Sequence, residues 1–466
     1  MSKFSLKFTD YDAFGFDLDH TLAKYKLPAL FKLCHNALAE FLVKEKGYHP
    51  DLQKPFELDK DFCTKGLIFD TVKGNFFKLD ENGTILRASH GTRFLSNDEI
   101  CATYGPDRHW KQYSKLAETV NNLGDEFRIF ENYFDMPGKV ICARMVDILD
   151  RKGAPEKYDI WKDVFDGYNH VYNPKNFSEE KGGFFPEIKL HPEKYLNKCS
   201  EDIKLWLKKL KEGNRKVFIL TSSYNDFATH LLKYILGENW SDYIDINLTF
   251  ARKPGFFNKN RPFLRVDQEL EKEPVQELNM GATYSQGNHK ILKQFLKKAT
   301  GVDDPKILFF GDSLRSDVFP AKMYVNWDTV VVLEEMEIEG MLGFDVKGQV
   351  QSDREDDDEP RKKKMKYTGP SVEEAEFLAS SKWGSFFYDN SCMGKEEGKG
   401  PKMMNTFWGY LIRRYSDISI PQLDYIVDFP MDHEYNVFDH EDYKREGFYP
   451  GIPKILASNS KNVEKD

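Results

Sequence analysis

The sequence predicts an α/β protein built on a mainly parallel sheet, and three observations support this. Short buried strands alternate with amphipathic helices after Pro192, which is the pattern of βαβ units. Four predicted strands end in, or lead directly into, a residue type that can bind phosphate or a cation. The first strand lies near residue 13, far from the others, and the stretch between them is too long for a loop. That stretch therefore predicts an inserted cap domain.

Composition narrows the class of protein and its partners. The 466 residues include 31% charged and 40% hydrophobic residues, which is typical of a soluble globular chain with about three domains or one domain with large insertions. Lys and Arg number 67 against 76 Asp and Glu, so the net charge is −9. A negative chain is a poor binder of nucleic-acid polymers and of anionic membranes. A local basic pocket for a small phosphorylated substrate stays compatible with it.

The sequence indicates no membrane segment and no secretory signal. No apolar run approaches the ~18 residues of a spanning helix, and the first residues, MSKFSLKFTDYD, lack an apolar signal core. The six cysteines are scattered and form no CxxC pair, so neither a zinc site nor a disulfide framework is indicated. We therefore expect a cytoplasmic protein with reduced thiols.

The first part of the chain predicts one strand, one helix and then antiparallel hairpins. Residues 13–17 form an apolar run that ends on a carboxylate, as in a buried strand. Residues 29–47 carry apolar side chains at helical spacing, and Gly47 ends the pattern. Between about 66 and 95, apolar pairs alternate with Gly- and Asn-containing turns, which predicts hairpins. An amphipathic helix follows at 139–150.

The second part of the chain alternates helices and strands. Such an alternation predicts right-handed βαβ units and hence a parallel sheet. The predicted elements are a helix from Ser200 to Gly213, a strand at 217–220, a helix from about 225, a strand at 244–250, a helix at 288–299, and strands at 307–310 and 329–333.

The chain is expected to fold as a discontinuous core, an insert and an extension. Segment 353–366 is an acidic block followed by a basic one, which predicts a solvated linker, and its basic half is weak support for a nuclear signal. Aromatic residues beyond it predict that the tail packs. The predicted units are a core of 1–45 and 190–345, an inserted cap and hairpin region of 46–189, a charged linker of 346–370, and a C-terminal extension of 371–466 packing on the core.

The strand ends carry the chemistry. Ligands of open parallel sheets bind outside the carboxyl ends of the strands. The first strand runs into Asp17-Leu18-Asp19-His20-Thr21-Leu22, the next ends at Thr221, a third leads into Arg252-Lys253-Pro254, and a fourth runs into Gly311-Asp312-Ser313-Leu314-Arg315-Ser316-Asp317. The order and context of the four segments, rather than any one of them, indicate a phosphoryl-transfer site.

This set of motifs resembles the haloacid-dehalogenase superfamily of phosphotransferases. FGFDLDHTL, ARKPGFF and GDSLRSD resemble the cytosolic purine 5′-nucleotidase family, over about 12–335. LVKEKGY, LRASHGT, YSQGN and KWGSFF resemble one member more closely, into the tail. The resemblance implies a Rossmann-like core with an inserted cap, a Mg²⁺-dependent phosphomonoesterase activity, and a nucleoside 5′-monophosphate as substrate.

The two carboxylates of the first motif suit two different roles. Phosphoryl transfer to an enzyme needs an oxygen nucleophile, and Asp17 at the strand tip can supply it by forming an aspartyl-phosphate. Asp19 can protonate the leaving alcohol and later deprotonate the attacking water. Mg²⁺ prefers oxygen ligands, and its expected ligands are the Asp17 carboxylate, the Asp19 carbonyl and Asp312.

Three further residues complete the expected phosphate site. The Thr221 hydroxyl and backbone N–H would donate to phosphate, and Lys253 would neutralise charge on its equatorial oxygens. Asp317 would hold the lysine or a water on the cation. His20 lies inside the first motif but is expected to pack locally.

The resemblance also bears on the substrate's organic part. Phe134 and Asp135 align with a Phe-Asn pair that purine nucleotidases place around the base, although an aromatic in a cap is often only core. The arginine and aspartate that those enzymes place on the nucleobase fall at Phe165 and Asn169. This departure leaves the chemistry intact and weakens the purine assignment.

Two alternatives stay open. The chain could hydrolyse another small phosphate ester, since cap residues set specificity and differ here. It could instead be an interaction or regulatory protein that kept the fold with negligible turnover, although such a protein would gain nothing from Asp19. A homo-oligomer is compatible with either.

Overall fold

A nine-stranded sheet forms the larger half of the molecule, with strand order β11-β10-β12-β9-β8-β2-β13-β14-β17. The computed structural model describes residues 5–121, 126–339, 378–389 and 404–439. From β12 to β17 all neighbouring strands are parallel, and the β10–β11 hairpin adds an antiparallel edge. The strands are β2 (Ala13–Phe16), β8 (Lys216–Leu220), β9 (Ile246–Thr249), β10 (Phe263–Asp267), β11 (Leu270–Val275), β12 (Thr283–Gln286), β13 (Ile307–Gly311), β14 (Asp328–Val332) and β17 (Ile418–Ile420). The predicted α/β class is confirmed.

The middle of this sheet is packed tightly on both faces. Every residue of β2, β8 and β13 is buried, as expected for parallel strands with helices on either side. Gly15 in β2 lies between Phe218 and Phe309, where a Cβ atom would approach the two rings to 2.4 and 2.8 Å. Glycine is therefore required there, and the close packing fixes β2 between its neighbours.

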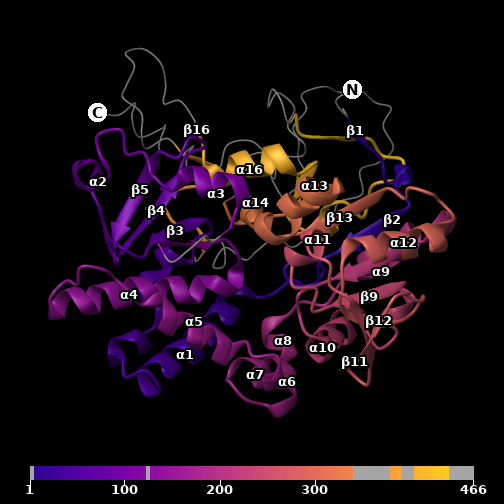
Figure 1. Cartoon of the computed structure of the whole chain (residues 1–466), viewed down its shortest axis with the longest axis horizontal. Coiled ribbons are helices and arrows are strands. Elements are labelled where there is room, and N and C mark those ends of the chain that lie inside the picture. Colours follow the sequence, from indigo (N-terminus) through magenta and orange to yellow (C-terminus); the bar gives the residue numbers. More distant parts are fainter. Residues whose placement is uncertain (1–4, 122–125, 340–377, 390–403, 440–466) are drawn as a thin grey trace, which may run out of the picture.

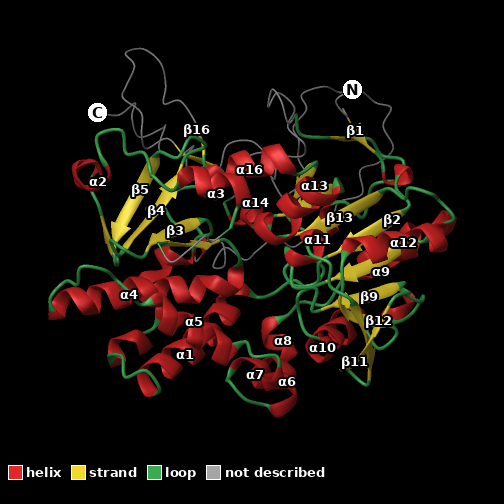
Figure 2. Ribbon diagram, viewed as in Figure 1, coloured by secondary structure: helices red, strands yellow, loops and turns green. Residues whose placement is uncertain are grey.

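Helices cover both faces of the main sheet (Figure 2). Ser200 and Asn288 cap two of them by accepting hydrogen bonds from backbone N–H groups in the first turn. The helices of this half are α9 (Glu201–Leu210), α10 (Asn225–Leu236), α11 (Gly255–Asn258), α12 (His289–Thr300), α13 (Phe319–Val325) and α14 (Glu335–Ile338). These agree with the helices expected near 200, 225 and 288.

The stretch between β2 and β8 builds a second half beside the first (Figure 1). Its antiparallel sheet has the order β6-β5-β4-β3-β7, and the β3–β4 and β4–β5 pairs are the hairpins expected between 66 and 95. The strands are β3 (Leu67–Asp70), β4 (Asn75–Leu79), β5 (Ile85–His90), β6 (Arg93–Phe94) and β7 (Phe127–Phe130). The helices are α1 (Leu27–Lys44), α2 (Asn97–Tyr104), α3 (Tyr113–Thr119), α4 (Met136–Lys152), α5 (Trp161–Val171), α6 (Lys175–Glu179), α7 (Phe184–Leu190) and α8 (Pro192–Tyr195), and a short helix η4 (Tyr133–Asp135) precedes α4.

Helix α1 packs against α4 and α5. It therefore belongs by its contacts with the helical layer of the insert, although it follows the first core strand directly. The boundaries proposed between core, insert and extension stay a prediction.

The described parts of the C-terminal region contact both halves. β17 pairs with β14 and extends the main sheet, while the indole N–H of Trp408 in α16 (Phe407–Tyr415) donates to the carbonyl of Gly66 at 2.7 Å. The remaining strands, all short, are β1 (Ser5–Leu6), β15 (Tyr388–Asp389), β16 (Met404–Asn405) and β18 (Tyr435–Asn436). One segment thus joins the insert to the core. The predicted linker 346–370, with its basic run, lies outside the described residues.

No helix in the described part of the chain combines the length and the apolar content that crossing a membrane requires.

Candidate active site

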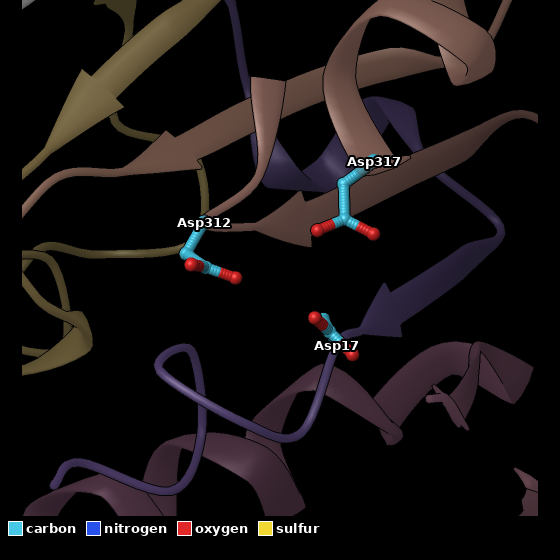
Figure 3. A group of neighbouring side chains, drawn as sticks. All are labelled: Asp17, Asp312 and Asp317. Carbon is cyan, nitrogen blue, oxygen red and sulfur yellow. The ribbon is translucent and has the colours of Figure 1, made fainter. Parts of the chain in front are cut away.

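Three carboxylates gather at the carboxyl edge of the main sheet. Asp17 directly follows β2, Asp312 directly follows β13, and Asp317 lies in η7 (Leu314–Val318), a single π-helical turn after Asp312. β2 and β13 are parallel neighbours, so their ends lie side by side. One carboxylate oxygen from each residue lies within 4.8 Å of the other two, and Figure 3 shows the three side chains converging on one space.

Lys253 joins two of these carboxylates. Its ammonium lies 2.7 Å from Oδ1 of Asp17 and 2.5 Å from Oδ1 of Asp317, and it is buried. Burial alone would lower the pKa of Lys253, but the two aspartates raise it above its ordinary value. The lysine is therefore charged. The pairing agrees with the expectation that Asp317 holds the lysine.

Asp19 is directed away from the three-carboxylate group. Its Oδ1 accepts a hydrogen bond from the Tyr25 hydroxyl at 2.7 Å, and its Oδ2 accepts from Ser223 Oγ at 2.6 Å and Thr221 Oγ1 at 3.4 Å. Burial, and next the charge of Asp17, raise the pKa of Asp19, while the hydrogen bonds from Ser223 and Tyr25 oppose the shift. A fixed carboxyl group with a raised pKa suits a residue that donates and then accepts a proton.

Thr221 differs in one respect from its predicted role. Its hydroxyl lies beside Asp19 and also accepts from the N–H of Ser223 at 3.0 Å. Its backbone N–H, however, donates to the carbonyl of Leu248 at 2.9 Å. The expectation that this N–H binds phosphate is wrong, because the β8–β9 pairing already uses it. Only the hydroxyl remains a candidate.

The site holds more negative than positive charge. Burial raises the pKa of Asp317 to about 7 and that of Asp312 well above its ordinary value, and the neighbouring aspartates add to both shifts. Lys253 opposes the shift at Asp317, and Lys65 opposes it at Asp312. Such a group of oxygens fits the preference of Mg²⁺ for hard oxygen ligands. The Asp19 carbonyl as a ligand stays a prediction.

His20 packs among aromatic rings, as expected. Its ring centroid lies 4.7 to 5.1 Å from those of Tyr25, Tyr133 and Phe134. Burial, and next the charge of Lys65, lower the pKa of His20 well below its ordinary value. Neither ring nitrogen has a hydrogen-bond partner in the described part of the chain. His20 is therefore neutral, and its ring packs against Tyr133 and Phe134 of the insert.

Phe134 and Asp135 lie in η4 of the insert. Phe134 contacts His20 at a centroid distance of 4.8 Å. Asp135 accepts from the Asn132 amide at 2.7 Å, and its own N–H donates to the Asn132 side-chain carbonyl at 3.1 Å. Burial raises the pKa of Asp135 to about 6. Phe134 also packs on Tyr25, whose hydroxyl donates to Asp19, and the contact of both Phe134 and Asp135 with substrate stays a prediction.

The two positions aligned with nucleobase-binding residues lie elsewhere. Phe165 and Asn169, both in α5, are exposed. The hydroxyl groups of Tyr168 and Tyr172 instead donate to the backbone carbonyls of Asp135 and Phe134. Tyr168 of α5 and Tyr172, which directly follows α5, thus contact η4, and α5 itself carries no arginine.

Three site residues were not expected from the sequence. Tyr25 binds Asp19, buried Lys65 pairs with Glu335 at 3.2 Å near Asp312, and Glu131 contacts the turn after Asp312. Only Tyr25, six residues after Asp19 in the same loop, offered a local signal. The other two belong to the insert and reach the site through its packing.

Comparison with known proteins agrees with this geometry. A model of the 5′ nucleotidase family matches residues 2–420. The 5′-nucleotidase domain-containing protein 1 of Homo sapiens is 41% identical over 458 residues, and that of Bos taurus 40%, each match covering 97% of this chain and 98% of the relative. The 5′-nucleotidase domain-containing protein 2 of Rattus norvegicus is 27% identical over 343 residues, which cover 72% of this chain and 59% of the relative. The resemblance drawn from the motifs is confirmed, and the chain belongs to the 5′ nucleotidase family of hydrolases.

Proposed function

We propose that this chain is a Mg²⁺-dependent phosphatase that hydrolyses nucleoside 5′-monophosphates through an aspartyl-phosphate. The observation that carries the proposal is the arrangement of Asp17, Lys253 and Asp312 at one sheet edge, with Asp19 fixed two residues after Asp17. Membership of the 5′ nucleotidase family supports the nucleotide as the substrate class.

In the first step Asp17 acts as the nucleophile. Both of its described contacts, from the Lys253 ammonium and the Leu18 N–H, fall on Oδ1, so the carboxylate is held firmly. A carboxylate oxygen attacks phosphorus as the bond from phosphorus to the ester oxygen breaks. Asp19 gives its proton to that departing oxygen and thereby becomes a carboxylate.

In the second step the aspartyl-phosphate is hydrolysed. Asp19, now ionised, takes a proton from water, and the water oxygen attacks phosphorus while the bond to Asp17 breaks. Inorganic phosphate leaves and both carboxyl groups return to their first state. Lys253 and the Thr221 hydroxyl would stabilise charge on the phosphoryl oxygens through both steps.

The Asp17 carboxylate, Asp312 and the Asp19 carbonyl would hold the Mg²⁺ ion. When bound, it neutralises charge on the phosphoryl group and on the carboxylates around it.

Asp312→Asn should weaken Mg²⁺ binding and abolish hydrolysis while the fold stays intact. Unchanged Mg²⁺ affinity in a calorimetric titration would remove Asp312 from the ligand set.

Phe134 and Asp135 are proposed to contact the organic part of the substrate. Alanine at either position should then mainly raise KM for a nucleotide and spare hydrolysis of a small aryl phosphate. Equal losses on both substrates would mark the two residues as core or gating residues.

A second candidate substrate class has its own support. Phe165 and Asn169 are exposed, and the residues that contact η4 are instead Tyr168 and Tyr172. The polar contacts that an arginine and an aspartate make with a purine in the purine nucleotidases are therefore missing at these two positions. Another small phosphate ester with an apolar or aromatic organic part would fit the same chemistry.

The deciding experiment is a phosphate-release screen over nucleotides and sugar phosphates, with and without Mg²⁺, using Asp17→Asn as the blank. Mg²⁺-dependent release from nucleotides alone supports the first candidate, and release from other esters supports the second. A rate equal to the blank on every substrate would favour an interaction or regulatory protein.

We also propose a cytoplasmic location, which the five unpaired cysteines of the described residues support.

A further inference from the structure

A buried glutamate of the insert contacts the turn that carries two of the site carboxylates. Glu131 directly follows β7 and is 3% exposed. Its Oε2 accepts from Ser313 Oγ at 3.0 Å, and its Oε1 accepts from the backbone N–H groups of Leu314 and, at 3.4 Å, Arg315. These donors are the three residues that follow Asp312.

The same turn is also held from within. Ser313 Oγ accepts from the N–H of Ser316 at 3.0 Å, and the N–H of Ser313 donates to Asp317 Oδ2 at 3.2 Å. The first N–H groups of a helical turn have no partner inside it, so a carboxylate that accepts from them fixes where the turn begins. Glu131 therefore helps to place Asp312 on one side and Asp317 on the other.

The buried position of the Glu131 carboxylate is electrostatically unfavourable, and hydrogen bonds must offset its cost. Its charge raises the pKa of Asp312, so it adds repulsion to a group that already has excess negative charge. A buried carboxylate is tolerated when several donors satisfy it. The three donors are all supplied by the turn after Asp312.

We propose that Glu131 is a positioning residue, through which the insert holds Asp312 and Asp317 in the arrangement that binds a divalent cation. This inference rests on the proposed Mg²⁺ site. It makes cation affinity depend on a residue that does not touch the cation.

Two substitutions separate position from charge. Glu131→Asp keeps the charge but is one methylene shorter, so it cannot reach the turn. Glu131→Gln removes the charge but keeps an acceptor for the N–H groups of Leu314 and Arg315. Asp147→Ala is the matched control, because Asp147 accepts from Thr92 N and Oγ1 at 3.0 and 2.6 Å within the insert, away from the turn.

The readouts are calorimetric titration with Mg²⁺ alone, amide hydrogen exchange over 312–319, and kcat and KM at varied Mg²⁺. Glu131→Asp should weaken Mg²⁺ binding by about 10- to 100-fold and speed exchange of the turn. At saturating Mg²⁺ its KM for the phosphate ester should stay unchanged. Glu131→Gln should stay within about threefold of wild type, and Asp147→Ala should match it.

The opposite order overturns the proposal. A Glu131→Asp protein with wild-type Mg²⁺ affinity, or a Glu131→Gln protein with the larger loss, would show that Glu131 does not act through position. If wild type hydrolyses phosphate esters with Mg²⁺ and Glu131→Asp binds the ion normally, this inference alone fails. If wild type binds no Mg²⁺, the proposed metal site fails and this inference with it.

Discussion

The Asp17–Asp312–Asp317 group and the Asp389 ion pairs both bury carboxylates, but their charge balance differs. Asp389, in β15, is fully buried and accepts from Lys78 Nζ and Arg87 Nε at 2.9 Å each. Lys78 also donates to the carbonyls of Trp383 and Ser385. There, two cations surround one carboxylate and the backbone takes up further donors. At the carboxyl ends of β2 and β13, three carboxylates lie together, and Lys253, the one bridging lysine among the described residues, contacts only Asp17 and Asp317 of the three.

The difference separates a structural use of buried charge from a chemical one. Burial lowers the pKa of Lys78, and Asp389 opposes that shift, whereas the paired aspartates of the site raise the pKa of Lys253 above its ordinary value. The ion pairs of Asp389 with Lys78 and Arg87 join the insert to the C-terminal region, and the charge of the carboxylate is already balanced by these cations. An excess of carboxylates remains costly until a cation joins it, and this supports the proposed phosphatase site at the carboxyl ends of the strands.

The largest expected effect comes from the nucleophile. Asp17→Asn replaces the nucleophilic carboxylate with a weakly nucleophilic amide, so phosphate release should fall more than ~10³-fold, and no covalent phosphate should be trapped. The fold should persist, since the variant also removes a charge from a crowded group. Trapping with beryllium fluoride followed by crystallography locates the phosphorylated residue, and an adduct on Asp19 would reverse the assignment.

The second effect is selective for the leaving group. Asp19→Asn keeps the nucleophile but loses the proton donor, a contribution of ~10²–10⁴-fold. An aryl phosphate has an acidic leaving alcohol that needs little protonation, so its loss should be much smaller than that of an alkyl phosphate. Parallel kcat measurements on the two esters test this. Equal losses would show that Asp19 does not protonate the leaving group.

The third effect belongs to the structural group and concerns stability. Asp389→Ala leaves Lys78 and Arg87 without their carboxylate, which should lower the free energy of unfolding by about 3–5 kcal/mol. Urea denaturation followed by tryptophan fluorescence measures it. Asp389→Asn, which keeps an acceptor, should cost less. Full stability with lost activity in Asp389→Ala would erase the distinction between the two groups.

The fourth effect is stabilisation by the cation itself. Mg²⁺ at about 100 times its Kd should stabilise wild type by ~2.7 kcal/mol, because it binds the folded site. Asp312→Asn should lose this gain and Asp389→Asn should keep it. Chemical denaturation with Mg²⁺ or with chelator measures both. A gain that survives in Asp312→Asn would place the cation elsewhere.

The smallest effect concerns buried His35, whose protonated form would be repelled by the charge of Arg144. Burial, and next Arg144, lower the pKa of His35 to about 4, below its ordinary value near 6.5. The unfolded chain therefore binds more protons between these values, and stability falls as pH falls through them. Wild type should lose roughly 2 kcal/mol more than His35→Gln between pH 7 and pH 5.

Unfolding free energies at several pH values check this, with His191→Gln, at a partly exposed histidine, as the control. Identical profiles for wild type and His35→Gln would mean that His35 charges freely in the folded protein.

Much of the site was readable because its signals are local. A buried apolar run followed by an acid predicts a strand with a carboxylate at its tip, and β2–Asp17 and β13–Asp312 both follow that rule. Parallel strands bring such tips to one edge, so the meeting of Asp17 and Asp312 followed from the fold class. The helices near 200, 225 and 288 followed in the same way from periodicity and caps.

Other features depend on contacts that no local pattern encodes. The N–H of Thr221 belongs to the sheet because β9 pairs with β8, and Lys253 joins Asp317 across 64 residues of sequence. Glu131 and Asp389 carry no motif, and each finds its donors only when the insert packs on the core or on the C-terminal region. The sequence alone identified the candidate residues at the strand ends, because strand pattern and residue type are local properties. The tertiary structure decided how their charges are balanced, because the Coulomb energy of a buried group depends on every neighbour that the folded chain brings near.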